Sequence, residues 1–305
     1  MQTTSHILMI RPVNFTFNAE TAVNNAFQVA GNDDAAQEKA LAEFDGFVAA
    51  LRKEGVDVTV VQDTPQPFTP DSIFPNNWIS FHEDGTVIFY PMYAPNRRLE
   101  RKQHVIDRVR EVFQIKSQID LSEYESKDIF LEGTGSMVLD RDNKIAYACL
   151  SPRTDKKVLH DFCKQTGYKP VSFRSVDMKG QEIYHTNVMM CVADRYVVIC
   201  LESISDKTER DMVESAIVAS GKKIVDINFD QVNHFAGNML QVENIFGEKL
   251  LVMSSQAYAS LTSDQLKLLN HYNRIVHSPL STIETNGGGS ARCMMAEVHL
   301  PASES

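Results

Sequence analysis

The amino-acid sequence predicts an α/β fold, a five-bladed and pseudo-symmetric α/β propeller. Four stretches, which begin at Asn76, Glu132, His185 and His234, each open with a polar or glycine-rich loop. Each continues as two apolar strands around a tight turn, a pattern typical of β-hairpins. A segment with helical spacing and a further short strand follow each hairpin. The repeating unit is therefore strand, strand, helix and strand.

Apolar residues recur every three or four positions in the segment after each hairpin, which predicts four amphipathic helices. They are Val105, Ile106 and Val109, then Val158, Leu159 and Phe162, then Met212, Val213 and Ile217, then Leu266, Leu269 and Tyr272. The closing strands are expected near residues 115–119, 171–173, 224–227 and 275–276.

The fifth unit is predicted to be split between the two ends of the chain. Residues 290–300 supply its first strand and residues 5–12 its second strand. Ala35–Lys53 supplies the helix and Val56–Val61 the last strand. Joining the two ends in one unit closes the ring, so residues 1–305 are expected to form a single domain.

Composition indicates a soluble globular protein rather than a binder of nucleic acid or membrane. The chain has 305 residues, of which 43% are hydrophobic and 23% charged, and a net charge of -10. Such an acidic chain disfavours binding to nucleic acid or an anionic membrane. The five cysteines show no paired spacing, and no secretory signal is recognised. We therefore expect a cytoplasmic protein with free thiols; the sequence leaves open whether it forms a homo-oligomer.

The loops that precede the first strand of each unit are expected to gather at one end of the ring. They read "PDSIFPNNW", "LEGTGS", "YHTNV", "NHFAGN" and "NGGGSARC". A nucleophile, acid–base groups and carboxylates thus occupy corresponding places in different units, which predicts an active site there. The candidates are Asp71, Asn76, Asn77, Glu132, His185, Asn187, His234 and Cys293.

Cys293 is the candidate nucleophile, whereas the other four cysteines lie in apolar segments and are expected to pack in the core. Glycines precede it, among them Gly288, and leave room for a substrate to approach. Arg292 is expected to favour the thiolate. His185 stands at a loop–strand junction as an acid–base candidate, with His234 as a weaker one. Glu132 is expected to orient the His185 imidazole.

Four segments resemble the guanidino-group modifying superfamily, the penteins, over nearly the whole chain. They are "GGGSARCM", "LEGTGSMVLD", "SPRT" and "PDSIF". The superfamily includes arginine and agmatine deiminases, dimethylarginine hydrolases and amidinotransferases. The resemblance implies that Cys293 attacks the planar carbon of a guanidino or ureido group. His185 would then protonate the departing nitrogen and activate water, Glu132 would favour the imidazolium, and no metal or organic cofactor would be required.

Three asparagines depart from the pattern of the guanidinium-binding relatives. Those relatives carry acidic residues where this chain has Asn77, often Asn76, and Asn187. Carboxamides are neutral and both donate and accept hydrogen bonds, which suits a ureido group better than a cation. The pattern most resembles citrulline utilization hydrolases, which implies conversion of citrulline and water to ornithine, carbon dioxide and ammonia. Asp71 keeps one acidic group in the area and leaves arginine possible.

Two alternatives to a citrulline hydrolase remain open. The first is a deiminase or dihydrolase that acts on arginine, methylarginine or an acylated arginine. The second is a non-enzymatic pentein that binds a partner, which would not require the combination of Cys293, His185 and Glu132.

The expected partner is a small amino-acid substrate. The resemblance implies that Arg153 binds its α-carboxylate. Arg97 or Arg98 is a second candidate for this role, because a pair of arginines suits a carboxylate. The long polar segment 14–34 is interpreted either as a lid over the site or as a surface excursion.

Overall fold

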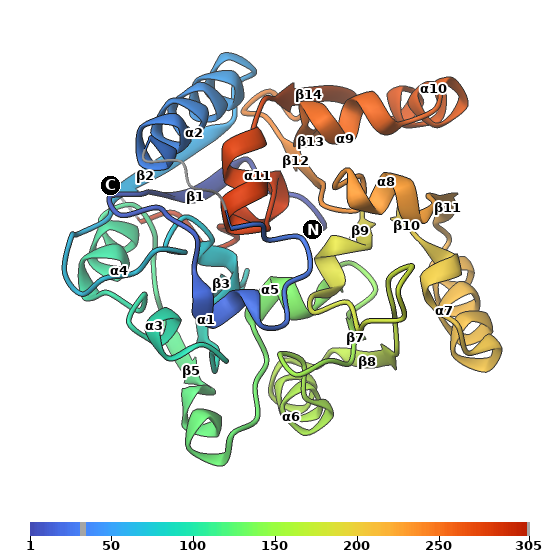
Figure 1. The fold of residues 1–305 in the computed structure, drawn as a ribbon, viewed down its shortest axis with the longest axis horizontal. Helices are drawn as coiled ribbons and strands as arrows, with labels where there is room; N and C mark the ends of the chain where they lie inside the picture. Colours follow the sequence, from blue (N-terminus) through green and yellow to red (C-terminus); the bar gives the residue numbers. More distant parts are fainter. Residues whose placement is uncertain (31–34, 304–305) are drawn as a thin grey trace.

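Five three-stranded sheets make up the fold in the computed structural model, which describes residues 1–30 and 35–303. Figure 1 shows the five units in sequence order about a common centre, with the long helices on the outside. The predicted α/β architecture of five similar units is therefore confirmed. Residues 31–34, at the end of the segment interpreted as a lid, and the last two residues of the predicted domain lie outside the described residues.

Each sheet has the same topology. Its first strand is antiparallel to the second, and the second is parallel to the third. A tight turn suffices for the antiparallel pair, whereas the parallel pair requires a crossover, here a helix. In the order first, second and third, the strands are β3 (Ile79–Phe81), β4 (Thr86–Phe89) and β5 (Ser117–Asp120); β6 (Val138–Asp140), β7 (Ile145–Cys149) and β8 (Lys169–Phe173); β9 (Met190–Val192), β10 (Tyr196–Ile199) and β11 (Lys223–Asp226); β12 (Leu240–Glu243), β13 (Lys249–Ser254) and β14 (Arg274–Ser278); and β15 (Ala296–Glu297), β1 (His6–Arg11) and β2 (Asp57–Gln62).

The crossover helices follow the predicted segments closely. They are α2 (Ala36–Lys53), α4 (Gln103–Arg110), α6 (Lys156–Thr166), α7 (Lys207–Ala219) and α10 (Ser263–Tyr272). Local signals set their ends: the Asp155 carboxylate accepts hydrogen bonds from two backbone N–H groups of α6. At the other end of α6, Gly167 adopts φ 77°, the left-handed conformation that terminates many helices.

The shorter helices lie in loops, three of them within units and three between units. Those within units are α1 (Ala19–Ala22), α3 (Pro95–Arg98) and α9 (Ser255–Ser260), and those between units are α5 (Gly133–Ser136), α8 (Phe229–Asn233) and α11 (Ser281–Gly287). Five 3-10 turns complete the described elements, namely η1 (Pro75–Asn77), η2 (Ser122–Lys127), η3 (Thr186–Val188), η4 (Leu201–Ser203) and η5 (Ala291–Met294).

The split fifth unit is confirmed. Ile7 pairs with Glu297 in β15, and His6 pairs with Asp57 in β2. The C-terminal strand is therefore locked into a sheet with the N-terminal one. Because η5 leads directly into β15, this pairing fixes the position of Cys293.

Helix faces and strands bury most of the predicted apolar residues. Val105, Val109, Leu159 and Phe162 are among those with at most 2% of their surface exposed. Burying each such side chain contributes roughly 1.5–3 kcal/mol to stability. Met212 is an exception: it is 41% exposed, because α7 turns only the neighbouring Val213 toward the sheet. Within the described residues, no helix is long and apolar enough to cross a membrane.

Candidate active site

The loops that lead into the first strands meet at one end of the sheets and enclose a small pocket. Turns η1, η3 and η5 and helix α5 supply its base, and α5 contacts both η1 and η3. The pocket is lined by Thr21, Asn25, Asp71, Phe74, Asn77, Arg97, Arg153, Tyr184, His185, Gly287, Gly289 and Cys293. Residues from all but one of the five units, together with the N-terminal segment, thus face one space.

Glu132 and His185 form a buried pair beside this pocket. The Oε2 atom of Glu132 lies 2.7 Å from Nε2 of His185, while Oε1 accepts a hydrogen bond from the backbone N–H of Tyr93 over 2.9 Å. Both side chains are almost fully buried. The carboxylate is thus held on two sides, and it fixes the orientation of the imidazole.

The charges around this pair set its protonation. Burial favours a high pKa for Glu132, but the Arg153 charge and the His185 bond outweigh it and lower the pKa to about 2. Burial lowers the pKa of His185 to about 4, although Glu132 opposes the change. Glu132 therefore raises the pKa of His185, as expected, but by less than burial lowers it. Burial and the nearby arginines keep the imidazole neutral at pH 7 in the ligand-free protein.

The Cys293 sulfur is held by two carboxamides. The Nδ2 atom of Asn238 lies 3.2 Å from Sγ, and Nδ2 of Asn187 lies 3.5 Å from it. Asn238 also accepts a hydrogen bond from the backbone N–H of Arg292. N–H groups pointed at sulfur stabilise the thiolate form relative to the thiol.

Asn238 is a site residue that was missed in the sequence interpretation. It lies inside the quoted loop "NHFAGN", of which the sequence interpretation named only His234. The signal that would have revealed it is repeat equivalence. Asn77, Asn187 and Asn238 each stand just before the first strand of their unit.

Glycines allow the loops to approach closely. A Cβ atom at Gly135 would lie 2.8 Å from Nδ1 of His185. Gly288 adopts φ 64°, a backbone conformation that residues with side chains rarely adopt. The carbonyl oxygen of Gly288 accepts a hydrogen bond from the Tyr184 hydroxyl. Gly288 therefore shapes the wall of the pocket through its backbone rather than lining it directly.

Asp71, Arg97 and Glu100 form a second buried group of charges. Arg97 donates two hydrogen bonds to the Glu100 carboxylate, and its Nε lies 4.0 Å from Asp71 Oδ2. Its Nη1 donates to the Asn77 side-chain oxygen over 2.8 Å. Burial raises the pKa of Glu100 to about 7, against the effect of Arg97. Burial likewise raises the pKa of Asp71.

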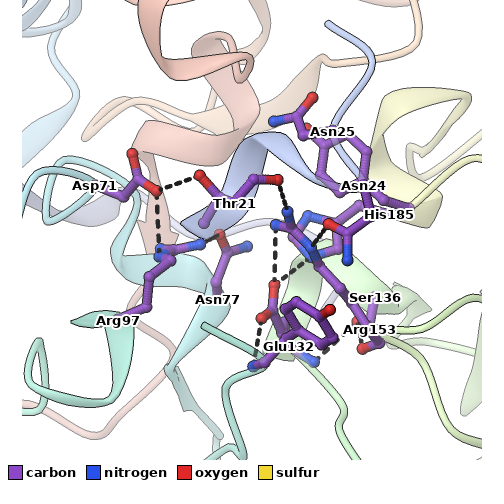
Figure 2. Close-up of polar contacts among 12 residues, drawn as sticks. Thr21, Asn24, Asn25, Asp71, Asn77, Arg97, Glu132, Ser136, Arg153 and His185 are labelled. Atoms are coloured by element: carbon purple, nitrogen blue, oxygen red, sulfur yellow. Dashed lines mark hydrogen bonds and ion pairs between the residues drawn. The ribbon is translucent and has the colours of Figure 1, made fainter. Parts of the chain in front are cut away.

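Arg153 is buried against the N-terminal segment (Figure 2). Its Nε donates to Asn24 Oδ1 over 2.7 Å, and its Nη2 donates to the Thr21 carbonyl oxygen over 2.6 Å. Its Nη1 lies 3.6 Å from Glu132 Oε2, and its guanidinium packs over the Tyr184 ring. The same arginine therefore links the N-terminal segment to the Glu132–His185 pair.

The N-terminal segment covers the pocket. Asn18 and Thr21 both donate hydrogen bonds to Asp71 Oδ2, and Asn25 contacts the Gly288 carbonyl. Thr21 and Asn25 also line the pocket itself. The described part of segment 14–34 thus lies where the lid interpretation requires it.

Four predicted residues lie elsewhere. Asn76 bonds to Thr134 and does not line the pocket, so Asn77 is the one that faces it. Arg98 donates to the carbonyls of Met92 and Tyr93.

Arg292 donates to the Met295 carbonyl and to Glu297, so its charge is neutralised away from Cys293. His234 is exposed and bonded within α8. These contacts correct the expectations that Arg98 binds substrate, that Arg292 favours the thiolate of Cys293 and that His234 belongs to the site.

The fold and this site place the chain in the pentein superfamily of guanidino-modifying proteins. The sequence model of the family described as "N,N dimethylarginine dimethylhydrolase, eukaryotic" matches residues 11–300. The chain therefore belongs to that family, whose description is that of a C–N bond hydrolase. None of the curated proteins matches the chain significantly by sequence.

Solved structures share this fold at low sequence identity. ArgZ, an arginine dihydrolase from the ornithine-ammonia cycle in Cyanobacteria, aligns with a TM-score of 0.75 and 19% identity over 98% of this chain. AgrE in a complex with ornithine and NAD+ aligns with a TM-score of 0.76 and 20% identity over 99% of this chain. This chain spans 42% of the ArgZ chain and 40% of the AgrE chain.

A dimethylarginine dimethylaminohydrolase bound to S-methyl-L-thiocitrulline aligns with a TM-score of 0.66 and 15% identity, over 97% of this chain and 99% of the other. The structural neighbours therefore include proteins solved with ornithine or with S-methyl-L-thiocitrulline.

Proposed function

We propose that this protein is a cysteine-dependent hydrolase that cleaves a C–N bond at the terminal guanidino or ureido carbon of an arginine-like amino acid. The observation that carries the proposal is the buried Glu132–His185 pair, 2.7 Å between Oε2 and Nε2, beside the pocket that Cys293 lines. A nucleophile, an acid–base group and an orienting carboxylate are the parts that covalent hydrolysis requires.

In the proposed reaction, neutral His185 takes the proton of the Cys293 thiol, and the thiolate attacks the planar carbon. An S–C bond forms, the C–N bond breaks, and the imidazolium gives its proton to the leaving nitrogen. His185 then removes a proton from water, which attacks the same carbon and releases the sulfur. Because Glu132 engages Nε2, the proton transfers fall to Nδ1. Asn187 and Asn238 stabilise the thiolate at each turnover.

The comparisons favour an arginine-type substrate as the first candidate. The matched family is named for dimethylarginine, and the ArgZ neighbour is an arginine dihydrolase. A cationic guanidinium requires an acceptor, and Asp71 lines the pocket with its Oδ1 atom free of hydrogen bonds from the described residues. We therefore assign Asp71 Oδ1 as the acceptor for the substrate guanidinium.

Citrulline is the second candidate, and the orientation of Asn77 favours it. Arg97 engages the Asn77 oxygen, so the amide N–H groups point to Asn76 and the remaining space. A donor at this position suits the oxygen of a ureido group and opposes a guanidinium, which only donates. Arg97 itself adds a positive charge to the pocket wall.

Arg153 is the proposed ligand of the substrate carboxylate. Its two donors now bind Asn24 and Thr21, so the N-terminal segment would exchange with the substrate. A free thiol nucleophile requires a reducing setting, and on that ground we place the protein in the cytoplasm.

The test is release of ammonia from arginine or citrulline, and of dimethylamine from dimethylarginine, by the purified protein, with analysis of the amino-acid product and Cys293→Ala as the control. Turnover of arginine or dimethylarginine supports the first candidate, and ornithine from citrulline alone supports the second. Turnover that persists in Cys293→Ala, or no turnover of any of the three, contradicts the proposed enzyme and favours the non-enzymatic alternative.

A further inference from the structure

A second pocket lies at the far end of the sheets from the catalytic pocket. It encloses about 770 Å³ of space that is continuous with solvent. Its wall includes His82, Glu83 and Asp84 after β3, Arg141 and Lys144 after β6, and Tyr168 before β8. Strands β3 and β6 begin next to Asn77 and α5 at the catalytic end, so the two pockets stand at opposite ends of the same strands. Their described linings share no residue.

Arg141 is a buried cation with unused donor capacity. Only 7% of the residue is exposed, and its Nε has no hydrogen-bond partner among the described residues. Within the described residues its ion pair, from Nε to Glu297 Oε1, spans 3.8 Å, too long for a hydrogen bond, and the Tyr168 side chain is hydrogen-bonded to the guanidinium. Glu297 is meanwhile bonded to Arg292 over 2.6 Å. A buried guanidinium normally has its donors satisfied, so this one calls for an acceptor.

Two carboxylates line the same pocket and offset part of its positive charge. Glu83 contacts the amino group of Met1, and Asp84 accepts a hydrogen bond from the backbone N–H of Thr86. Lys144 is exposed, and its Nζ lies 4.7 Å from the centre of the Tyr168 ring, with no carboxylate paired to it in the described residues. With the amino group of Met1, Arg141 and Lys144, the pocket lining holds three cations against the two carboxylates of Glu83 and Asp84.

Two histidines beside the pocket have lowered pKa values, and the positive charge of Arg141 contributes to both shifts. Burial, followed by the charge of Arg141, lowers the pKa of His82 to about 3. Burial and Arg141 also lower the pKa of His299, whose Nε2 lacks a hydrogen-bond partner among the described residues. Both imidazoles are therefore neutral and able to donate one hydrogen bond each.

We propose that this pocket is a binding site for a small oxyanion, a carboxylate or phosphate group, held by Arg141 and Lys144. The guanidinium offers planar donors that match either group, and the ammonium adds a point charge at the mouth. The site lies outside the catalytic pocket and does not depend on the proposed reaction.

The test is titration of the full chain with inorganic phosphate and, separately, with malonate, at constant ionic strength set by sodium chloride. Isothermal titration calorimetry and the shift in Tm are the readouts, since a ligand of the folded state raises Tm saturably. Lys144→Asn is the main variant, because Lys144 has φ 53° and asparagine tolerates that conformation. We expect it to weaken binding about fivefold or more, the effect of losing one partly solvated charge. Arg141→Gln is expected to abolish saturable binding.

Two controls locate the binding. Lys179→Asn alters another exposed turn lysine outside the pocket and is expected to bind like the unaltered protein. Arg153→Gln is expected to retain binding, because it changes only the catalytic pocket. Binding of phosphate but not malonate, or the reverse, identifies which oxyanion the site takes. Absence of saturable binding of both, or binding that Lys144→Asn leaves unchanged and Arg153→Gln removes, overturns the proposal.

Discussion

Arg153 Nε donates a hydrogen bond to Asn24 Oδ1 over 2.7 Å, although 129 positions separate the two residues. The adjacent Nη2 donates to the Thr21 carbonyl oxygen over 2.6 Å. Two oxygens in this arrangement resemble the two oxygens of a carboxylate facing an arginine. In the ligand-free protein the N-terminal segment therefore occupies the donors that we assign to the substrate carboxylate.

Replacing Asn24 by alanine removes one of these competing oxygens. If Arg153 binds the substrate carboxylate, the Asn24→Ala variant should show a KM lowered about three- to tenfold, the worth of one charge-assisted hydrogen bond. The kcat should change little, because Asn24 does not contact the described catalytic groups. Steady-state kinetics on the active substrate measures this, with Asn14→Ala as the control, since Asn14 bonds only to the Pro65 carbonyl. A KM that stays unchanged would assign the carboxylate to another residue.

Asn238 is expected to act on Cys293 rather than on substrate binding. Removing its N–H donor in Asn238→Ala should lower kcat about tenfold or more, because the thiolate loses a hydrogen bond worth roughly 1.5–3 kcal/mol. The KM should stay within about twofold. Alkylation of Cys293 by iodoacetamide at fixed pH should slow in parallel, with Cys293→Ala as the blank. Unchanged alkylation together with a lower kcat would show that Asn238 has only a structural role.

The two neighbouring asparagines allow a matched test of substrate charge. Asn77 lines the pocket, whereas Asn76 bonds to Thr134 away from it. Asn77→Asp replaces an N–H donor by an acceptor, so the ratio of kcat/KM for arginine to that for citrulline should rise about tenfold or more. Asn76→Asp should change this ratio much less. Equal effects of the two substitutions would mean that Asn77 does not contact the reacting group.

Acid should destabilise the protein through His185. Its pKa is lowered to about 4 in the folded state, below the ordinary value of 6.5, so the unfolded state binds the proton more tightly. The stability that depends on neutral His185 is present above pH 6.5 and is lost as the pH falls toward 4. Glu132, whose pKa is lowered to about 2, loses its contribution only below its ordinary value of 4.5.

Other buried groups, among them His82, His299 and Glu100, also titrate between pH 6.5 and 4.5, so the contribution of His185 is measured as the difference between the protein and a variant that lacks this histidine. Urea unfolding across this window should show a smaller loss of stability for His185→Gln than for the unaltered protein, by on the order of 2 kcal/mol. Parallel curves for the two proteins would contradict the buried neutral imidazole. His104→Gln is the control, because His104 is partly exposed and, within the described residues, its ring is hydrogen-bonded to the Gln62 carbonyl alone.

Much of the fold could be predicted from the sequence because its signals are local. The hairpin turns and the helix periodicity each depend on residues close to one another in the chain, and the split fifth unit followed from matching its segments, at opposite ends of the chain, to the same repeat. The placement of Cys293 at a fixed strand entrance followed from the pairing of the two ends, as in the contact of Ile7 with Glu297. The convergence of the loops then follows from the repeat.

The directions of individual side chains could not be predicted in the same way. Arg97 and Arg98 are adjacent, yet one faces the pocket and the other binds backbone carbonyls. Arg292 adjoins Cys293, yet its partner Glu297 draws it away. Asn238 was overlooked because its contact with Cys293 spans 55 positions. On a short turn, successive residues point in different directions, and distant partners select among them.

The sequence by itself determined the repeating unit, the joining of the two ends and the presence of a cysteine, a histidine and a glutamate in corresponding loops. The tertiary structure alone decided which asparagine faces the pocket, which arginine is covered by the N-terminal segment and that a second, cationic pocket stands at the other end of the strands. The physical reason is that turns and periodic faces arise from neighbours in the chain. The partners of a buried charge, by contrast, are whatever groups folding brings within hydrogen-bonding distance.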